Sequence, residues 1–153
     1  MSPTRSDAAW AAGFFDGEGH ISMRDRTGRG HLEKYKSPRS IILAITQLDD
    51  EVLLKFQAVM AGRGKIYAEP RTAYRERKQA MVSYTRYQWR TGKRGDILFV
   101  VERMWPGLGS IKRLQAATAI VKHTELDPHQ LQVVPDYLRQ YYNDRAGDVP
   151  EKE

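Results

Sequence analysis

The sequence contains no cysteine among its 153 residues. This absence excludes disulfide bonds and thiolate metal sites, and it fits a reducing compartment. No apolar run approaches the roughly 20 residues that a membrane-spanning helix needs, and the first residues, MSPTRSDAAW, contain no apolar signal segment. We therefore expect an intracellular protein without a membrane partner. The length predicts a single domain, residues 1–143, followed by a polar tail, residues 144–153, that we expect to be disordered.

Acidic side chains are scarce in one long stretch of the chain. The formal net charge is +6, and residues 61–95 hold ten basic side chains against only Glu69 and Glu76. Clustered Lys and Arg attract polyanions, because each neutralised phosphate releases condensed counterions. Such a cluster can also be an ordinary solvated surface. The aromatic residues Tyr84, Tyr87 and Trp89, interleaved with the charges, favour a nucleic-acid partner.

The spacing of apolar residues predicts alternating helices and strands. Alanine-rich residues 7–16 predict a helix that ends at the glycines 17 and 19. Alternating patterns predict strands over 20–26, 39–47, 64–71 and 80–91, the third of them a short strand broken by Pro70. Helical spacing predicts helices over 49–62, 96–105, 110–124 and 133–143. This order predicts an α+β fold whose helices cover one face of a four-stranded sheet. The other face would carry arginines and fit the major groove of DNA.

The residues best suited to chemistry lie in the stretch AAGFFDGEGHI, residues 11–21. Gly13 and Gly17 are four residues apart, so they share a helix face and allow another backbone to approach closely. Asp16 and Glu18 lie at the carboxyl end of the helix, where the macrodipole disfavours acids. Carbonyls and a carboxylate that converge there would suit a hard cation such as magnesium. On spacing alone, the simpler interpretation is a helix end whose acids point into water.

Residues 11–19, AAGFFDGEG, resemble the LAGLIDADG signature of homing endonucleases. Further segments resemble single-motif members in the same order: ITQ, GRGKIY, YQW, ILFVVERMW, PGL and then a lysine on the following helix. The resemblance spans residues 8–122 and implies the αββαββα LAGLIDADG endonuclease fold, with a four-stranded antiparallel DNA-binding saddle covered by helices. It also implies a site-specific double-stranded DNA endonuclease of intron or intein homing. Such an enzyme cleaves a long, near-palindromic target by metal-dependent phosphodiester hydrolysis.

The resemblance assigns roles to particular residues. Glu18 matches the metal-binding carboxylate, and the Gly17 carbonyl lies beside it in the motif. Gln47 matches a residue that organises water near the scissile phosphate, and Lys112 one that activates water or stabilises charge. The implied cofactor is Mg²⁺, for which other divalent cations can substitute. The sequence departs from the pattern where Glu18 replaces the commoner aspartate and where Glu51 stands at a position that is arginine in some members.

A single motif implies a homodimer, because one site would cut one strand of a duplex. We expect the motif helices to pair through Ala12, Gly13 and Asp16. This pairing would bring two Glu18 carboxylates together, and bound cations would relieve their repulsion. Asp16 itself is expected to bond backbone at the helix interface rather than to bind metal.

Contacts with double-stranded DNA are expected from two groups of residues. Base readout is predicted for side chains on the open strand faces, namely Ser22, Arg24, Arg26, Ser40, Thr46, Tyr67, Arg86, Gln88 and Arg90. Phosphate contacts are predicted for basic residues in turns, namely Lys34, Lys36, Lys93 and Arg94. Two other functions remain compatible with the same fold: an RNA-splicing maturase that binds its intron, and a DNA-binding regulator that does not cleave. The presence of Glu18, Gln47 and Lys112 favours the enzyme over the regulator.

Overall fold

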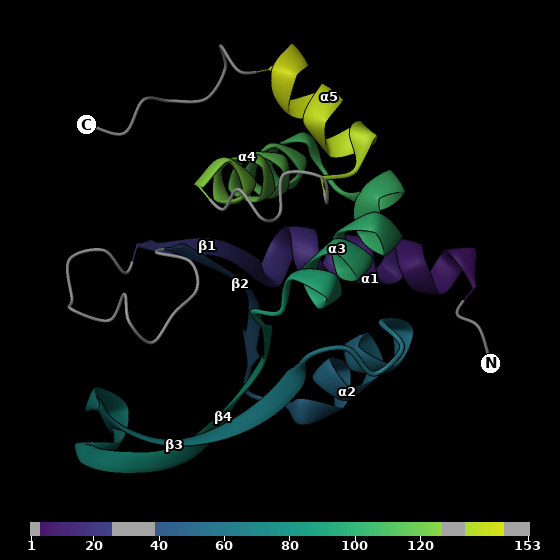
Figure 1. Ribbon diagram of the computed structural model, residues 1–153. Helices are drawn as coiled ribbons and strands as arrows, with labels where there is room; N and C mark the ends of the chain where they lie inside the picture. The colour runs from purple at the N-terminus through teal and green to yellow at the C-terminus, as the bar shows by residue number, and fades with distance from the viewer. Residues whose placement is uncertain (1–3, 26–38, 127–133, 146–153) are drawn as a thin grey trace.

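The computed structural model describes residues 4–25, 39–126 and 134–145. Its elements follow the predicted order of helix, two strands, helix, two strands and further helices (Figure 1). In chain order, with η marking short 3₁₀ helices, they are α1 (Arg5–Glu18), β1 (Gly19–Asp25), β2 (Arg39–Gln47), α2 (Asp50–Val59), β3 (Lys65–Arg75), η1 (Glu76–Lys78), β4 (Ala80–Thr91), α3 (Arg94–Met104), η2 (Trp105–Gly107), α4 (Ser110–Leu126) and α5 (Asp136–Asp144). None of the described helices is long and apolar enough to cross a membrane.

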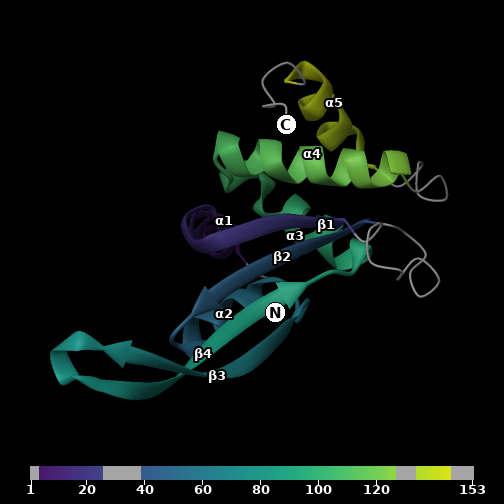
Figure 2. The same ribbon diagram turned by 90° about the vertical axis from the view of Figure 1, so that its left-hand side faces the viewer.

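The four strands form one antiparallel sheet in the order β1-β2-β4-β3. Successive side chains of a strand point to opposite faces, and the buried Ile41, Leu43 and Ile45 of β2 mark the face that meets the core. Helices α1, α2 and α3 lie on that side, and no described helix covers the opposite face (Figure 1, Figure 2). This is the predicted α+β arrangement with one open sheet face.

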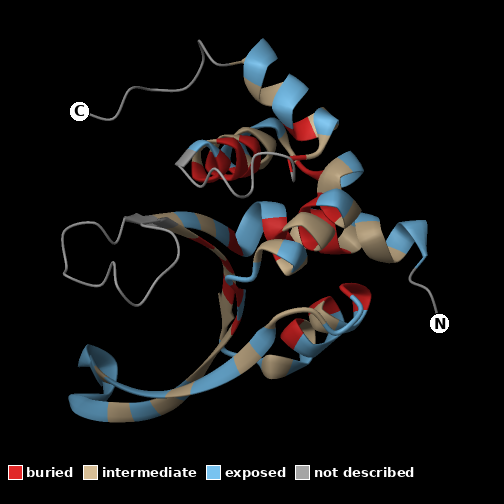
Figure 3. Ribbon diagram, in the orientation of Figure 1, coloured by how far each residue is buried: buried red, intermediate tan, exposed pale blue. Residues whose placement is uncertain are grey.

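Trp89 of β4 lies at the centre of the packing between sheet and helices. Its side chain is fully buried and contacts Phe56 of α2 edge-on, with 4.8 Å between ring centroids. The indole Nε1 donates a hydrogen bond to the Arg63 carbonyl at 2.8 Å. Gly64 has a positive φ of 80°, and a Cβ there would lie 2.4 Å from the Trp89 Nε1. A glycine is therefore required for the turn after α2 to pass over this ring. Other buried residues cluster between the sheet and helices (Figure 3).

Helix α1 begins with a capping box. The Thr4 hydroxyl accepts the Asp7 backbone N–H, and the Asp7 carboxylate accepts the Thr4 N–H. The backbone hydrogen bond from Thr4, followed by that from its hydroxyl, lowers the pKa of Asp7. The sequence predicts a helix end at residue 16, but α1 continues to Glu18, because the backbone first becomes extended at Gly19. The carboxyl-terminal acids thus lie in the last helical turn.

Strand β3 differs most from its prediction. The sequence predicts a short strand over residues 64–71 that is broken by Pro70, but β3 continues to Arg75, and Pro70 pairs with Thr85 of β4. The reason is topological: β3 is an edge strand, and an edge strand accommodates a proline when the missing N–H would face away from its partner. At the other end of the chain, helix α5 ends at Asp144, the first residue of the predicted tail, and the disorder of that tail stays a prediction. Residues 146–153 of that tail lie outside the described residues.

The hairpin of β3 and β4 extends well beyond the rest of the sheet. Strand β2 pairs only with residues 87–91 of β4, whereas β3 and β4 pair with each other from Lys65–Arg90 to Arg75–Ala80. Residues 69–86 therefore form a two-stranded projection, here called the β3–β4 arm, that extends away from the helices (Figure 1, Figure 2). Most of its residues are exposed (Figure 3).

Candidate functional site

The structure brings together two of the three predicted catalytic residues. Gly19 pairs with Ile45 in the first two strands, so the end of α1 lies beside the end of β2. Glu18 is the exposed last residue of α1, and Gln47 is the half-buried last residue of β2. The Gln47 Nε2 donates a hydrogen bond to the Glu18 Oε2 at 3.3 Å. This bond orients the carboxylate at the junction between the motif helix and the sheet.

Asp16 joins the same helical turn to α4. Its Oδ1 accepts the backbone N–H of Gly109 of the same chain at 3.0 Å, so Asp16 bonds backbone, while its predicted place at an interface between two copies stays a prediction. A Cβ at Gly109 would lie 2.8 Å from the Asp16 Oδ2, so the close approach requires glycine. Helix α4 begins one residue later and carries Lys112, half-buried, in its first turn. Within the described residues, Lys112 forms no hydrogen bond or ion pair with Glu18, so this third residue shares the region without direct contact.

The oxygen donors at the end of α1 could supply part of a cation site but not a complete one. No group of three His, Asp or Glu side chains in the described ranges could hold a metal ion. Glu18 offers one exposed carboxylate, and the Gly17 carbonyl lies in the last turn of the helix, where carbonyls lack helical partners. Magnesium is commonly bound by one or two carboxylates, with waters and substrate phosphates completing its octahedron. The residues present therefore fit a cation that is shared with a phosphate ligand.

The departure at Glu51 has a structural explanation. Glu51 lies in the first turn of α2, and its backbone N–H bonds the carboxylate of the cap residue Asp49 at 2.9 Å. An acid is favourable there, because the amino end of a helix carries partial positive charge. Glu51 thus stabilises the start of α2 and supplies no basic support to the site.

Most of the predicted base-reading residues share the open face of the sheet. Because Trp89 points into the core, its neighbours Gln88 and Arg90 point the other way, and the strand register aligns them with residues of the flanking strands. The predicted residues with described side chains on this face are Ser22, Ser40, Thr46, Tyr67, Arg86, Gln88 and Arg90. Arg24 pairs with Ser40 in the register of β1 and β2. The predicted contacts Arg26, Lys34 and Lys36 lie outside the described residues.

Comparison with known proteins finds similarity in structure only. No protein-family model and no curated protein matches the sequence. Among solved structures, the homing endonuclease I-CvuI in complex with DNA aligns with a TM-score of 0.56 at 20% identity, covering 98% of this chain and 87% of that chain. The archaeal intron-encoded homing endonuclease I-Vdi141I, complexed with DNA, gives 0.56 at 13% identity, covering 97% and 87%. The LAGLIDADG homing endonuclease I-SmaMI, bound to cleaved DNA, gives 0.53 at 14% identity, covering 96% and 51%.

This chain has the LAGLIDADG homing endonuclease fold. The αββαββα order, the four-stranded antiparallel sheet and the position of the motif helix all agree with the expectation from the sequence. The sheet of the LAGLIDADG fold is the predicted saddle, and its open face is the one that carries the arginines.

Side chains on the open face of this LAGLIDADG fold are already in contact with one another. The Gln88 Nε2 donates to the Thr46 hydroxyl at 3.3 Å, and the Arg90 guanidinium lies 4.5 Å from the centre of the Tyr67 ring. The sequence prediction omitted four charged residues of β3 that share this face, namely Lys65, Glu69, Arg71 and Arg75. Alternation counted outward from Tyr67 identifies Lys65 and Glu69 directly, and it identifies the residues after Pro70 only when the strand is continued through that proline.

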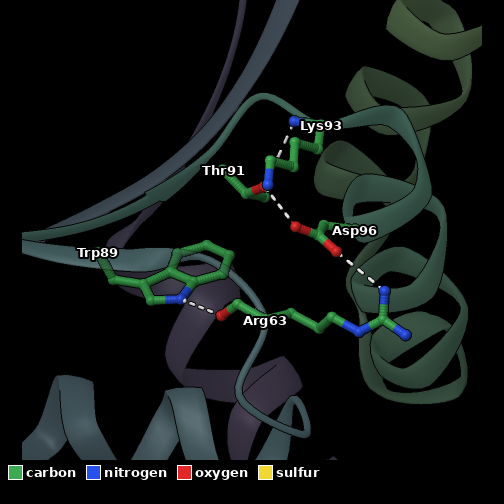
Figure 4. Close-up of polar contacts among 5 residues, drawn as sticks. All are labelled: Arg63, Trp89, Thr91, Lys93 and Asp96. Atoms are coloured by element: carbon green, nitrogen blue, oxygen red, sulfur yellow. Dashed lines mark hydrogen bonds and ion pairs between the residues drawn. The ribbon is translucent and has the colours of Figure 1, made fainter.

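A polar network fixes the end of β4 against α3 beneath the open face (Figure 4). Asp96 accepts hydrogen bonds from Arg63 at 2.9 Å and from the Thr91 hydroxyl at 3.4 Å. The Thr91 hydroxyl in turn accepts the Lys93 backbone N–H at 3.4 Å. Lys93 remains exposed at the cap of α3, as its predicted role as a phosphate contact requires.

The prediction of an open turn at Arg94 is wrong. Arg94 is the first residue of α3. Its half-buried guanidinium donates a hydrogen bond to the Thr124 hydroxyl and contacts the His123 Nδ1 at 3.3 Å. Both partners are buried residues of α4. The side chain thus links α3 to α4 inside the protein and is not available to a phosphate.

The predicted contact surface of α1 also needs correction. Ala12 is fully buried and packs against η2, where a Cβ at Gly107 would lie 2.8 Å from the Ala12 Cβ. It therefore cannot face a partner chain. Gly13 and Gly17 are exposed, and a Cβ at either position would meet no atom within 4 Å. Within the described residues of this chain, packing gives no reason for glycine at these two helical positions.

Two large apolar side chains are exposed near the carboxyl end of α1. Leu48 follows Gln47, which bonds Glu18, and 70% of its surface is exposed. Ile111 lies two residues after Gly109 and is 73% exposed. Gly13 and Gly17 are exposed on the same helix.

Proposed function

We propose that this protein is a divalent-metal-dependent endonuclease that cleaves double-stranded DNA at a specific site. The observation that carries the proposal is the Gln47–Glu18 hydrogen bond, which joins the end of the motif helix to a sheet whose open face carries arginines. An exposed acid beside a basic surface suits hydrolysis of DNA, and the exposed Glu18 beside a sheet whose open face carries Arg86 and Arg90 supports the proposal. The fold shared with I-CvuI and I-Vdi141I supports the same assignment.

Each site residue has a distinct contribution in this proposal. Glu18, with the Gly17 carbonyl, would hold the cation, which polarises a scissile phosphate and lowers the pKa of an attacking water. Gln47 fixes the rotamer of Glu18 through its hydrogen bond. Asp16 fixes the position of the motif helix relative to α4. Lys112, in the first turn of α4, supplies positive charge to the phosphate region.

We further propose that the enzyme acts as a homodimer through α1. The chain carries one motif and covers only 51% of the I-SmaMI chain, and one site per protomer would cut one strand. The exposed Gly13 and Gly17 would let a second α1 approach closely, with Asp16 at the edge of the contact and Leu48 and Ile111 buried by it. Two-fold symmetry of such a dimer predicts a near-palindromic target.

The test is cleavage of a randomised double-stranded DNA library with and without Mg²⁺. Wild type is expected to enrich and cut a near-palindromic duplex on both strands only when the metal is present. The Glu18→Gln variant keeps the size of the side chain but loses its charge, and it should bind the same duplex without cutting it. Glu102→Gln, which changes an exposed acid on α3, is the matched control and should cut like wild type.

Three outcomes would overturn the proposal in different ways. Cleavage by Glu18→Gln at the wild-type rate would remove Glu18 from the site. Specific binding without cutting by wild type would identify a DNA-binding protein on an endonuclease fold. Failure to select any duplex, together with specific binding to a structured intron RNA, would favour the maturase.

A further inference from the structure

Glu69 is an acid in the middle of the basic open face. It lies on β3 directly opposite Arg86 of β4, and Arg71 follows two residues later on the same face. The Glu69 Oε2 accepts a hydrogen bond from the Arg86 Nη2 at 2.7 Å and a second from the Arg71 Nη2 at 3.0 Å. One carboxylate oxygen thus holds two guanidinium groups side by side at the base of the β3–β4 arm.

Neither DNA affinity nor fold stability accounts for an acid at this position. A carboxylate on a surface that meets phosphates opposes binding, because it cancels one of the charges that displace counterions. Ion pairs on an exposed surface contribute little to stability, and all three side chains are partly exposed, at 32% for Glu69, 35% for Arg86 and 48% for Arg71. Hydrogen bonds from Arg86 and then Arg71 lower the pKa of Glu69, so the carboxylate stays charged.

What the carboxylate does supply is a fixed orientation for Arg86. An arginine has five N–H donors in a planar fork. One Arg86 donor is taken by Glu69, and the Nε–H is buried without a partner in the described structure. Three terminal donors remain, two on Nη1 and one on Nη2, and the bond to Glu69 restricts how the planar guanidinium can turn. A guanidinium edge fixed in this way matches the paired O6 and N7 acceptors of guanine in the major groove.

We propose that Glu69 is a specificity-determining positioning residue, which holds Arg86 so that its outer edge reads a guanine in the target duplex. The inference rests on the proposed function, because it requires that the open face binds DNA. It predicts that removing the charge of Glu69 strengthens non-specific binding and weakens discrimination at one base pair per half-site. A residue that only stabilised the fold would not separate these two effects.

The test compares Glu69→Gln with Glu76→Gln in binding to every single-base variant of the duplex that wild type selects. Glu76 lies in η1 of the same hairpin, and its side chain forms no hydrogen bond or ion pair within the described part of the chain. Each variant removes one negative charge, so both should bind random DNA more tightly and with a steeper salt dependence. Only Glu69→Gln should lose preference for one G·C pair, by about five-fold or more, since a bidentate arginine–guanine contact discriminates by at least about that factor.

Two further variants assign the effect to Arg86. Arg86→Lys keeps the charge but removes the fork, so it should lose preference at the same base pair as Glu69→Gln. In the Arg86→Ala background, adding Glu69→Gln should cause no further loss there, because residues that act through one contact are not additive. Equal thermal unfolding midpoints for all variants exclude loss of fold as the cause.

The outcomes separate this inference from the function on which it rests. If wild type selects a duplex but Glu69→Gln and Glu76→Gln give the same base profile, Glu69 has no positioning role and the endonuclease proposal stands. A loss at a base pair that Arg86→Lys leaves unchanged would also overturn the inference. Failure of wild type to select any duplex overturns both proposals.

Discussion

Replacing both exposed glycines of α1 by alanine should move the stability of the protomer and the affinity of the dimer in opposite directions. Glycine inside a helix costs about 1 kcal/mol relative to alanine, and a Cβ at Gly13 or Gly17 meets nothing within 4 Å in the protomer. Gly17 lies in the last turn, where the gain is smaller. The double variant should therefore stabilise the isolated protomer by about 1–2 kcal/mol, or roughly 3–6 °C in Tm.

In the dimer the same two methyl groups occupy the proposed contact. Two-fold symmetry places four added methyl groups between the paired helices, and overpacking of this kind typically costs about 1–3 kcal/mol. The dimer dissociation constant should rise by about ten-fold or more. Sedimentation equilibrium measures that constant. Urea unfolding at protein concentrations well below the dimer dissociation constant measures the stability of the protomer alone.

Gly95→Ala is the matched control for this experiment. Gly95 is an exposed glycine of α3 that likewise has no atom within 4 Å of a Cβ. Its substitution should leave the dimer constant unchanged while stabilising the protomer slightly. A Gly13→Ala/Gly17→Ala variant that dimerises as tightly as wild type would refute close approach through this face of α1. If the double variant is less stable than wild type as a protomer, the added methyl groups meet atoms of the same chain, which contradicts the open space at Gly13 and Gly17.

Three other predictions concern the packing of the core, the stability of the protein at alkaline pH and the base preference of the open face. Trp89→Phe should lower the free energy of unfolding by about 2–3 kcal/mol in urea titration, because it leaves a cavity and an unpaired Arg63 carbonyl. Burial chiefly raises the pKa of Tyr137 to about 12, so the native phenol keeps a proton that the unfolded chain loses, and stability should fall as the pH rises above 10. Tyr137→Phe should flatten that fall and, by removing a buried hydroxyl without a partner, should not destabilise the protein at neutral pH. Arg90→Ala should relax preference at particular base pairs, whereas Lys93→Ala should weaken binding evenly, and equal, uniform losses in a profile of single-base variants would contradict this assignment.

Features that depend on local pattern could be predicted from the sequence. The strict alternation of residues 80–91 assigned Gln88 and Arg90 to one face and Trp89 to the other, because side-chain direction in a strand follows from position alone. The acids at the end of α1 were also predictable from composition and glycine spacing. Their connection with Gln47, which is 29 residues away from Glu18, came only from the family resemblance, since no local rule joins a helix end to a strand end.

Features that depend on tertiary partners could not be predicted in this way. The burial of Ala12 results from its contact with η2, far along the chain. The hydrogen bond of Arg94 depends on Thr124 of α4, which lies 30 residues later in the chain. The continuation of β3 through Pro70 depends on its place at the sheet edge, which the sequence of the strand itself does not encode. In each case the missing information was the identity of the neighbour in space.

The β3–β4 arm has a consequence for how this chain can change over time. Two paired strands without a third are marginally stable by themselves. Amide protons of residues 69–86 should therefore exchange by local opening, far faster than those of residues 87–90, which pair with a strand on both sides. Since the arm contributes little to the cooperative unit that folds, most substitutions in it remove little stability. The surface of the arm can therefore accumulate mutations while the motif helix and its hydrogen bonds to Gln47 and Gly109 stay under constraint. Substitutions in the arm can therefore change what the open face binds without first unfolding the protein.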